Sequence, residues 1–180
     1  MPLSEIDQLR YSRFDEFIEY LRCQLETNGK DGDPIYQPIA EGEELVSEEK
    51  AANFKDCMMR MVGEKGWRRF WIATNAQGEI IGHIDLRARP EPHTQHRVLL
   101  GMGLLKDVRG LGIGSQLLHH AIDWLRGRRD IEWIDLCVMS ENKAALSLYR
   151  KFGFELQGEY KQMFVIDGEY HDYLSMTKHV

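Results

Sequence analysis

A glycine-rich turn between a strand pattern and a helix pattern constrains this chain more than any other feature. Residues 108–115 read Val-Arg-Gly-Leu-Gly-Ile-Gly-Ser, and apolar residues at helical spacing follow at 117, 118, 121, 122 and 125. Glycine lets a backbone turn tightly and approach a ligand without a Cβ clash. The first N–H groups of a helix lack internal acceptors and carry its positive dipole end, so a phosphate or pyrophosphate is the expected occupant. A strand-to-helix turn without a ligand is the alternative.

Two common phosphate-binding motifs are absent from this turn. A P-loop requires Gly-Lys-Ser/Thr, which is absent from the sequence. The dinucleotide fingerprint G-x-G-x-x-G fails because its last position is Ser115 when counted from Gly110 and Leu117 when counted from Gly112. The pattern that remains is R-x-x-G-x-G, formed by Arg109, Gly112 and Gly114.

A second motif follows about thirty residues downstream. Residues 142–154 read Asn-Lys-Ala-Ala-Leu-Ser-Leu-Tyr-Arg-Lys-Phe-Gly-Phe, and Asn142, Ala145, Leu146 and Tyr149 share one face of the predicted helix. Together the two motifs resemble the GNAT superfamily of acyl-CoA N-acyltransferases, with its R/Q-x-x-G-x-G/A and N-x-x-A-x-x-L-Y-x-x-x-G-F segments. The resemblance covers roughly residues 70–176.

The order of predicted elements agrees with that resemblance. Ser12 and Ser47 are expected to cap two N-terminal helices, which end near Asn28-Gly29 and Gly63. Further helices are expected at 112–126 and 142–152, and strands at 5–9, 70–74, 79–89, 97–105, 133–138, 161–166 and 169–176. We expect a single N-acetyltransferase domain over residues 1–180, of α/β class (α+β by some schemes). The resemblance implies the acyl-CoA N-acyltransferase fold, a central mixed, splayed β-sheet flanked by helices.

Composition excludes several classes of function. The formal net charge of −6 argues against a nucleic-acid binder, and no stretch approaches the ~20 apolar residues of a membrane span. The start of the chain has no basic and apolar secretory signal. Cys23, Cys57 and Cys137 form no CxxC pair and are expected to be reduced, packed thiols of a cytoplasmic protein. The sequence is also compatible with a homodimer.

The resemblance implies acetyl-CoA as co-substrate and assigns residues to it. Backbone N–H groups of the glycine loop would hold the pyrophosphate, and the strand end would pair with the pantetheine amides. Asn142 would bind the pantetheine arm, with a helix N-cap role as its alternative. Gly101 and Gly103 fit close approach by a ligand, or a bulge. The implied cofactor-binding residues are Leu104, Leu105, Arg109, Gly110, Leu111, Gly112, Ile113, Gly114, Ser115 and Asn142.

The catalytic residues are less constrained. Tyr149 is the expected general acid for the leaving thiolate, with a core tyrosine as the alternative. Asp85 is taken as the candidate base, and His83 is a second candidate; both share a strand face with Arg87, which a solvated sheet surface would also explain. Some family members keep a glutamate in the strand before the glycine loop, and this chain has no carboxylate there. No metal is expected, because the paired histidines lack companions at ligand spacing.

The function that the resemblance implies is transfer of an acetyl group from acetyl-CoA to a primary amine, directly and in a ternary complex. A small cationic amine is the expected acceptor, because acidic residues gather between Glu41 and Glu49. Acetylation of a protein N-terminus or lysine, of the ribosomal-protein type, is one alternative. A catalytically silent acyl-CoA sensor is the other.

Overall fold

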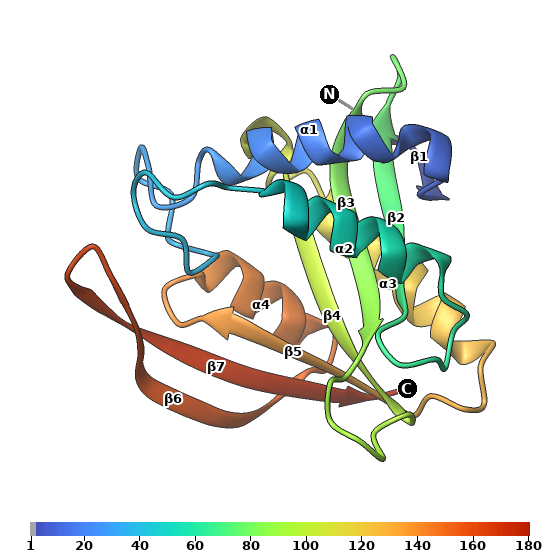
Figure 1. The fold of residues 1–180 in the computed structure, drawn as a ribbon. Coiled ribbons are helices and arrows are strands. Elements are labelled where there is room, and N and C mark those ends of the chain that lie inside the picture. Colours follow the sequence, from blue (N-terminus) through green and yellow to red (C-terminus); the bar gives the residue numbers. More distant parts are fainter. Residues whose placement is uncertain (1–2) are drawn as a thin grey trace.

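The strands form one mixed sheet, in a computed structural model that describes residues 3–180. Its strand order is β1-β2-β3-β4-β5-β7-β6, and only β4 and β5 run parallel as neighbours (Figure 1). The predicted mixed sheet is confirmed. The strands are β1 (Leu3–Gln8), β2 (Arg68–Asn75), β3 (Ile80–Ala88), β4 (Arg97–Leu104), β5 (Trp133–Met139), β6 (Glu155–Ile166) and β7 (Glu169–His179).

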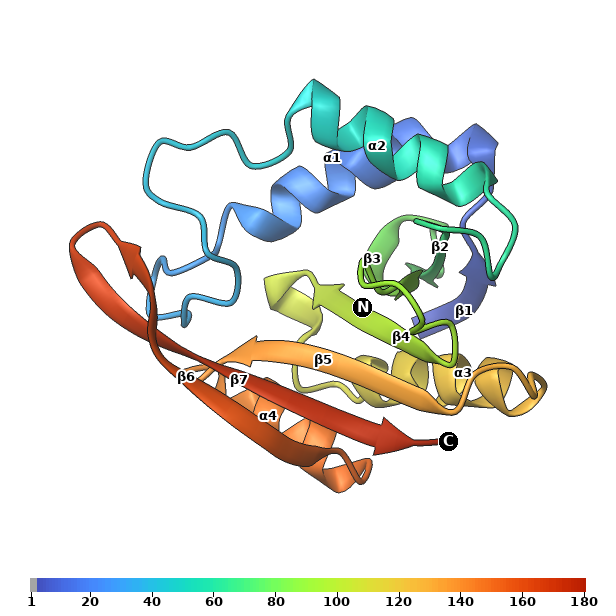
Figure 2. The same ribbon diagram turned by 60° about the horizontal axis from the view of Figure 1, so that its bottom comes forward.

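Helices cover both faces of the sheet. Figure 2 shows α1 (Phe14–Leu25) and α2 (Glu48–Met59) on one side, and α3 (Ile113–Arg126) and α4 (Lys143–Lys151) on the other. Phe17 of α1 packs with Phe70 and Ile72 beneath the first pair of helices. A larger apolar cluster, which includes Ile84 and Leu117, fills the other side. Two short 3-10 turns, Tyr11–Arg13 and Lys106–Val108, precede α1 and the glycine loop.

The N-terminal helices differ in part from the sequence prediction. Ser47 caps α2 as predicted, since its hydroxyl accepts the N–H of Lys50 at 3.1 Å. Ser12 is not a cap, because it lies inside the 3-10 turn before α1. The second helix ends at Met59, four residues before Gly63, where Arg69 donates to the carbonyl oxygens of Met58 and Arg60 at 2.9 and 2.6 Å. An arginine bound to the last carbonyls stabilises a helix end.

The cysteine prediction was half right. All three cysteines are free, but Cys23 and Cys137 are exposed rather than packed. Cys137 lies on β5 between the buried residues Leu136 and Val138, so its side chain points to the other, more open face. Within residues 3–180, no helix is long and apolar enough to cross a membrane.

The C-terminal hairpin touches the loop between α1 and α2. The predicted turn at Asp167-Gly168 joins β6 to β7, and both strands are longer than expected. The Asp167 carboxylate accepts the N–H of Glu41 at 3.1 Å, so the hairpin tip contacts the acidic loop. The β6–β7 register shifts between Tyr160 and Phe164, where Gln162 has a φ of 51°.

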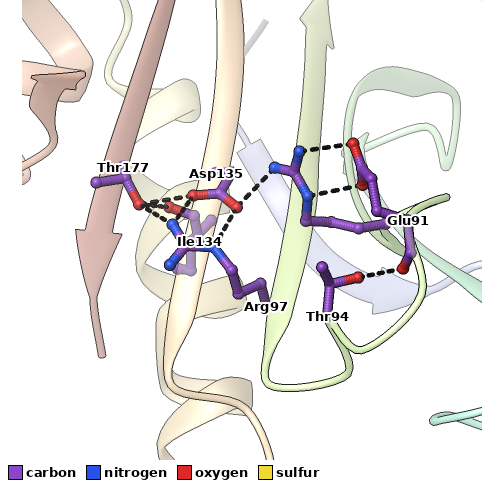
Figure 3. Close-up of polar contacts among 7 residues, drawn as sticks. Glu91, Thr94, Arg97, Ile134, Asp135 and Thr177 are labelled. Carbon is purple, nitrogen blue, oxygen red and sulfur yellow. Dashed lines mark hydrogen bonds and ion pairs between the residues drawn. The ribbon is translucent and has the colours of Figure 1, made fainter. Parts of the chain in front are cut away.

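The parallel strands β4 and β5 separate soon after they begin. Their pairing has three residue pairs and ends at Leu99 with Asp135, whereas β4 stays paired with β3 as far as Leu104. An ion cluster fixes this point (Figure 3): the Asp135 carboxylate accepts Arg97 Nη2 and Thr177 Oγ1, both at 2.6 Å, and Arg89 Nη1 at 2.8 Å. The cluster therefore ties the two strands to β7 at the start of their separation.

We expect Asp135→Asn to destabilise the fold by about 2 kcal/mol or more, because it removes the charge that two arginines share in a largely buried site. Urea unfolding measures this change. Asp123→Asn is the matched control, since its exposed ion pair with Arg126 should contribute within about 0.5 kcal/mol. Equal free energies of unfolding for the two variants would contradict a structural role for the cluster.

Candidate active site

The gap between β4 and β5 exposes backbone amides of β4. The Leu105 N–H donates to the carbonyl of Ile81 at 3.0 Å, so this amide points to β3. Because strand amides alternate in direction, those of Leu104 and Met102 point toward the gap. Among the described residues, the Leu104 amide thus has no backbone partner, so it is free to donate to a ligand in the gap. The Leu105 amide is not free in this way, because it is bonded to Ile81.

The glycine loop forms an open cradle of N–H groups at the start of α3. Gly110 and Gly112 have φ values of 76° and 82°, and a Cβ built on either would meet no atom within 4 Å. Among the described residues, no backbone acceptor is bound to the N–H groups of residues 110–115, and Gln116 is the first to bond, to Gly112. Free amides at a helix start suit a pyrophosphate. The Arg109 N–H, expected in the same set, donates to Lys106 instead.

The Arg109 side chain connects the cradle to the segment after α1. It donates to Asp33 Oδ2 at 2.7 Å and to Thr27 Oγ1 at 3.0 Å, and its guanidinium lies over the Tyr36 ring at 5.3 Å. Its Nε also lies 3.4 Å from the carbonyl oxygen of Leu104. The Arg109 side chain therefore holds the glycine loop and the end of β4 against the segment that follows α1.

Asn142 and Tyr149 both lie on the α4 segment. Asn142 caps the helix, since Oδ1 accepts the Ala145 N–H at 3.2 Å, and its Nδ2 stays available to donate to a ligand. Both roles considered for Asn142 are therefore compatible. Tyr149 is 6% exposed. Burial first, and then the neighbouring Tyr173 and Asp85, raise the pKa of Tyr149 well above the ordinary tyrosine value.

The polar face of β3 is buried, so a solvated sheet surface was the wrong interpretation. Asp85 is 1% exposed and accepts from Arg68 Nε at 2.8 Å, Arg68 Nη2 at 2.9 Å and Arg87 Nη1 at 2.9 Å. Burial alone would raise the pKa of Asp85, but these guanidinium groups hold it well below its usual range. The ion pairs argue against Asp85 as a direct base.

His83 lies on the same face and is 8% exposed. Burial lowers its pKa to about 4, so the imidazole is neutral at pH 7. Its Nδ1 lies 3.0 Å from the hydroxyl of Tyr20 on α1. Neither Tyr20 nor Gln24, also on α1, was predicted from the sequence. The signal was available, because both are polar positions on the helix face that carries Phe17 and Leu21.

Gly101 and Gly103 leave room for these side chains. A Cβ on Gly101 would lie 2.4 Å from Asp85 Oδ1, and one on Gly103 would lie 2.8 Å from His83 Cε1 and 3.0 Å from Gln24 Oε1. The β3–β4 pairing has no register shift here, so neither glycine marks a bulge. Both therefore serve the packing of the buried polar face.

Three buried residues have polar atoms without a partner. Within the described chain, His83 Nε2, the Gln24 side-chain amide and the Tyr149 hydroxyl have no hydrogen-bond partner. None of them is fully enclosed, since His171 Nε2 is the only fully enclosed unpartnered side-chain atom in that part of the chain. Buried residues with accessible polar ends are typical of a binding site.

Metal ligands were also sought among residues 3–180. No group of three histidine, cysteine or carboxylate side chains there could hold a metal ion. The adjacent histidines pack against aromatic rings instead: His119 lies 4.7 Å from the Phe152 ring, and His120 lies 5.9 Å from that of Trp71.

The sequence of this chain also matches a known protein family. Residues 39–154 match the family model described as the Acetyltransferase (GNAT) family. The L-amino acid N-acetyltransferase AaaT of Escherichia coli is 29% identical over 105 residues, which are 56% of this chain and 62% of that protein. The chain therefore spans less than two thirds of that relative's length.

Solved structures share the fold over nearly the whole chain. A GNAT acetyltransferase from Streptococcus pneumoniae superposes with a TM-score of 0.81 at 23% identity, covering 99% of this chain and all of that one. A phosphinothricin acetyltransferase from Sinorhizobium meliloti, solved with AcCoA, gives 0.78 at 20% identity, covering 100% and 89%.

We expect Gly112→Asp to weaken coenzyme A binding at least tenfold relative to Gly112→Asn, as measured by calorimetry. The two side chains have nearly the same size and both tolerate a positive φ, so the comparison isolates a negative charge beside the amide cradle. A tenfold loss corresponds to about 1.4 kcal/mol. Equal affinities for the two folded variants would remove this loop as the pyrophosphate site.

Proposed function

This chain belongs to the acetyltransferase (GNAT) family, and on that premise we propose that it transfers an acetyl group from acetyl-CoA to a primary amine. Acetyl-CoA supplies the acetyl group as a thioester, which a neutral amine attacks directly within a ternary complex. The observation that carries the proposal is the gap between β4 and β5, which has free β4 amides on one edge and the amide cradle nearby.

The chain offers donors along the length of an extended ligand. The N–H groups of residues 110–115 suit the pyrophosphate, and Asn142 Nδ2 together with the Leu104 amide suits the pantetheine arm. Most of these donors are backbone groups with fixed positions. In this proposal they bind and orient the co-substrate without side-chain rearrangement.

Tyr149 is proposed to protonate the leaving thiolate. Its raised pKa keeps the hydroxyl protonated at every working pH, but it also makes the hydroxyl a weaker acid. A thiolate formed beside the buried Tyr149 hydroxyl is poorly solvated and binds a proton more strongly than one in water. Proton transfer is therefore favoured when the thiolate forms beside Tyr149.

Replacing Tyr149 by Phe keeps the ring and removes the proton. We expect kcat to fall by about 10²–10⁴-fold while coenzyme A affinity stays near that of the wild type, because general acid catalysis acts on the transition state. Steady-state kinetics and calorimetry measure the two quantities. The control is Tyr160→Phe, since Tyr160 is exposed on β6. Unchanged kcat in Tyr149→Phe would assign thiolate protonation to water.

The proposed acceptor is a small cationic amine. Glu41, Glu43 and Glu44 are exposed in the loop that meets the β6–β7 tip, and they would raise the local concentration of a cation. Arg87 favours a second candidate, an amine that also carries a carboxylate. Arg87 uses only Nη1 in its bond to Asp85, and its side chain is 35% exposed.

An acetylation assay over an amine panel distinguishes these acceptors. For a cationic acceptor, KM should rise with salt, and kcat/KM should fall in Glu43→Gln/Glu44→Gln but not in the control Glu132→Gln/Glu155→Gln. Glutamine keeps the acceptor oxygen that Glu43 offers to the Ala40 N–H. A KM increase confined to amino acids in Arg87→Gln would favour the second candidate.

Two other results would change the proposal itself. Turnover of peptides alone would favour a protein acetyltransferase. Tight coenzyme A binding without turnover of any amine would overturn acetyl transfer and leave an acyl-CoA sensor.

A further inference from the structure

The Tyr20 hydroxyl lies between two possible hydrogen-bond acceptors. It is 2.9 Å from the carbonyl oxygen of Gly103 and 3.0 Å from Nδ1 of His83. A carbonyl oxygen can only accept, and a tyrosine hydroxyl has one proton to donate. The proton of Tyr20 therefore goes to Gly103, and the contact with His83 requires a proton on Nδ1.

This arrangement selects one tautomer of a neutral histidine. With the proton on Nδ1, the lone pair is on Nε2, which has no partner in the described chain and is not fully enclosed. The adjoining Cε1 lies 2.8 Å from the point where a side chain of Gly103 would begin. The unprotonated side of the His83 ring thus lies against Gly103 of β4, whose neighbours Met102 and Leu104 have the amides that face the gap.

This inference rests on the acetyl transfer proposed above. We propose that Tyr20 is a positioning residue, which holds His83 in the Nδ1–H tautomer so that Nε2 takes the proton of the acceptor amine. Burial raises the pKa of Tyr20 well above its ordinary value, so the hydroxyl keeps its proton. The aromatic contacts of His83 with Phe17 and Tyr20, each with ring centroids 5.5 Å apart, limit ring rotation.

The amine lone pair forms a C–N bond to the acetyl carbonyl carbon, and the C–S bond breaks with its electron pair on sulfur. One amine proton goes to His83 Nε2, and the thiolate takes the hydroxyl proton of Tyr149. Solvent then deprotonates His83 and reprotonates Tyr149, which leaves the acetylated amine and free coenzyme A.

The surrounding charges favour His83 over Asp85 for this role. The Asp85 carboxylate already accepts three guanidinium hydrogen bonds, from Arg68 and Arg87, and is sealed from solvent. Its negative charge favours a proton on His83, whereas the charges of Arg68 and Arg87 disfavour one. Asp85 therefore offsets part of the effect of the two arginines on His83.

Nitrogen-15 NMR of histidine-labelled protein tests the tautomer directly. In the wild type at pH 7, His83 should show a protonated Nδ1 and an unprotonated Nε2, with the signals assigned by their loss in His83→Gln. In Tyr20→Phe, which keeps the ring, the Nε2–H tautomer should appear. A wild-type His83 protonated on Nε2 would overturn the inference without bearing on acetyl transfer.

Kinetics test the proton transfer. We expect kcat to fall about 10²–10⁴-fold in His83→Gln and at least tenfold in Tyr20→Phe, with coenzyme A affinity within twofold of wild type. Tyr160→Phe is the matched control and should keep wild-type kcat. Full kcat in a folded His83→Gln variant would overturn the role of His83 while acetyl transfer stands. An inactive wild type would instead refute the proposed function.

Discussion

The separation of β4 from β5 after Leu99 is the constraint on which the rest of the site depends. A parallel pair that continued past Asp135 would satisfy the amides of Met102 and Leu104 and leave no opening between the strands. The separation leaves those amides unpaired, while β3 keeps β4 fixed as far as Leu104. The Asp135 cluster holds the strands together where the gap begins.

Polar side chains are also buried on the face of β3 that α1 and α2 cover. Asp85 and His83 occupy positions where an ordinary sheet would place apolar side chains under α1 and α2. Such groups are stable only with partners, which come from Arg68, Arg87 and Tyr20. Asp85 and His83 also require glycine at positions 101 and 103, because a Cβ at either position would collide with one of these side chains.

The sequence predicted what local signals determine. The glycine loop, the helix after it and the Asn142 cap depend on residues close in the chain, and the element order and fold class agreed with the structure. Contacts between distant segments could not be predicted. Tyr20 meets His83 across 63 positions, and Arg109 meets Asp33 across 76. The motif also did not show that the Leu105 amide points to β3, because that direction depends on how β4 pairs with its neighbour.

We propose that the free edge of β4 binds an extended acyl-CoA ligand. Amide hydrogen exchange with and without coenzyme A, resolved by residue, tests this claim most directly. The account predicts increased protection on binding at Met102 and Leu104 and at residues 110–115, with little change at Val98, which is already paired with β5. Unchanged exchange at Met102 and Leu104 in protein saturated with coenzyme A would contradict it.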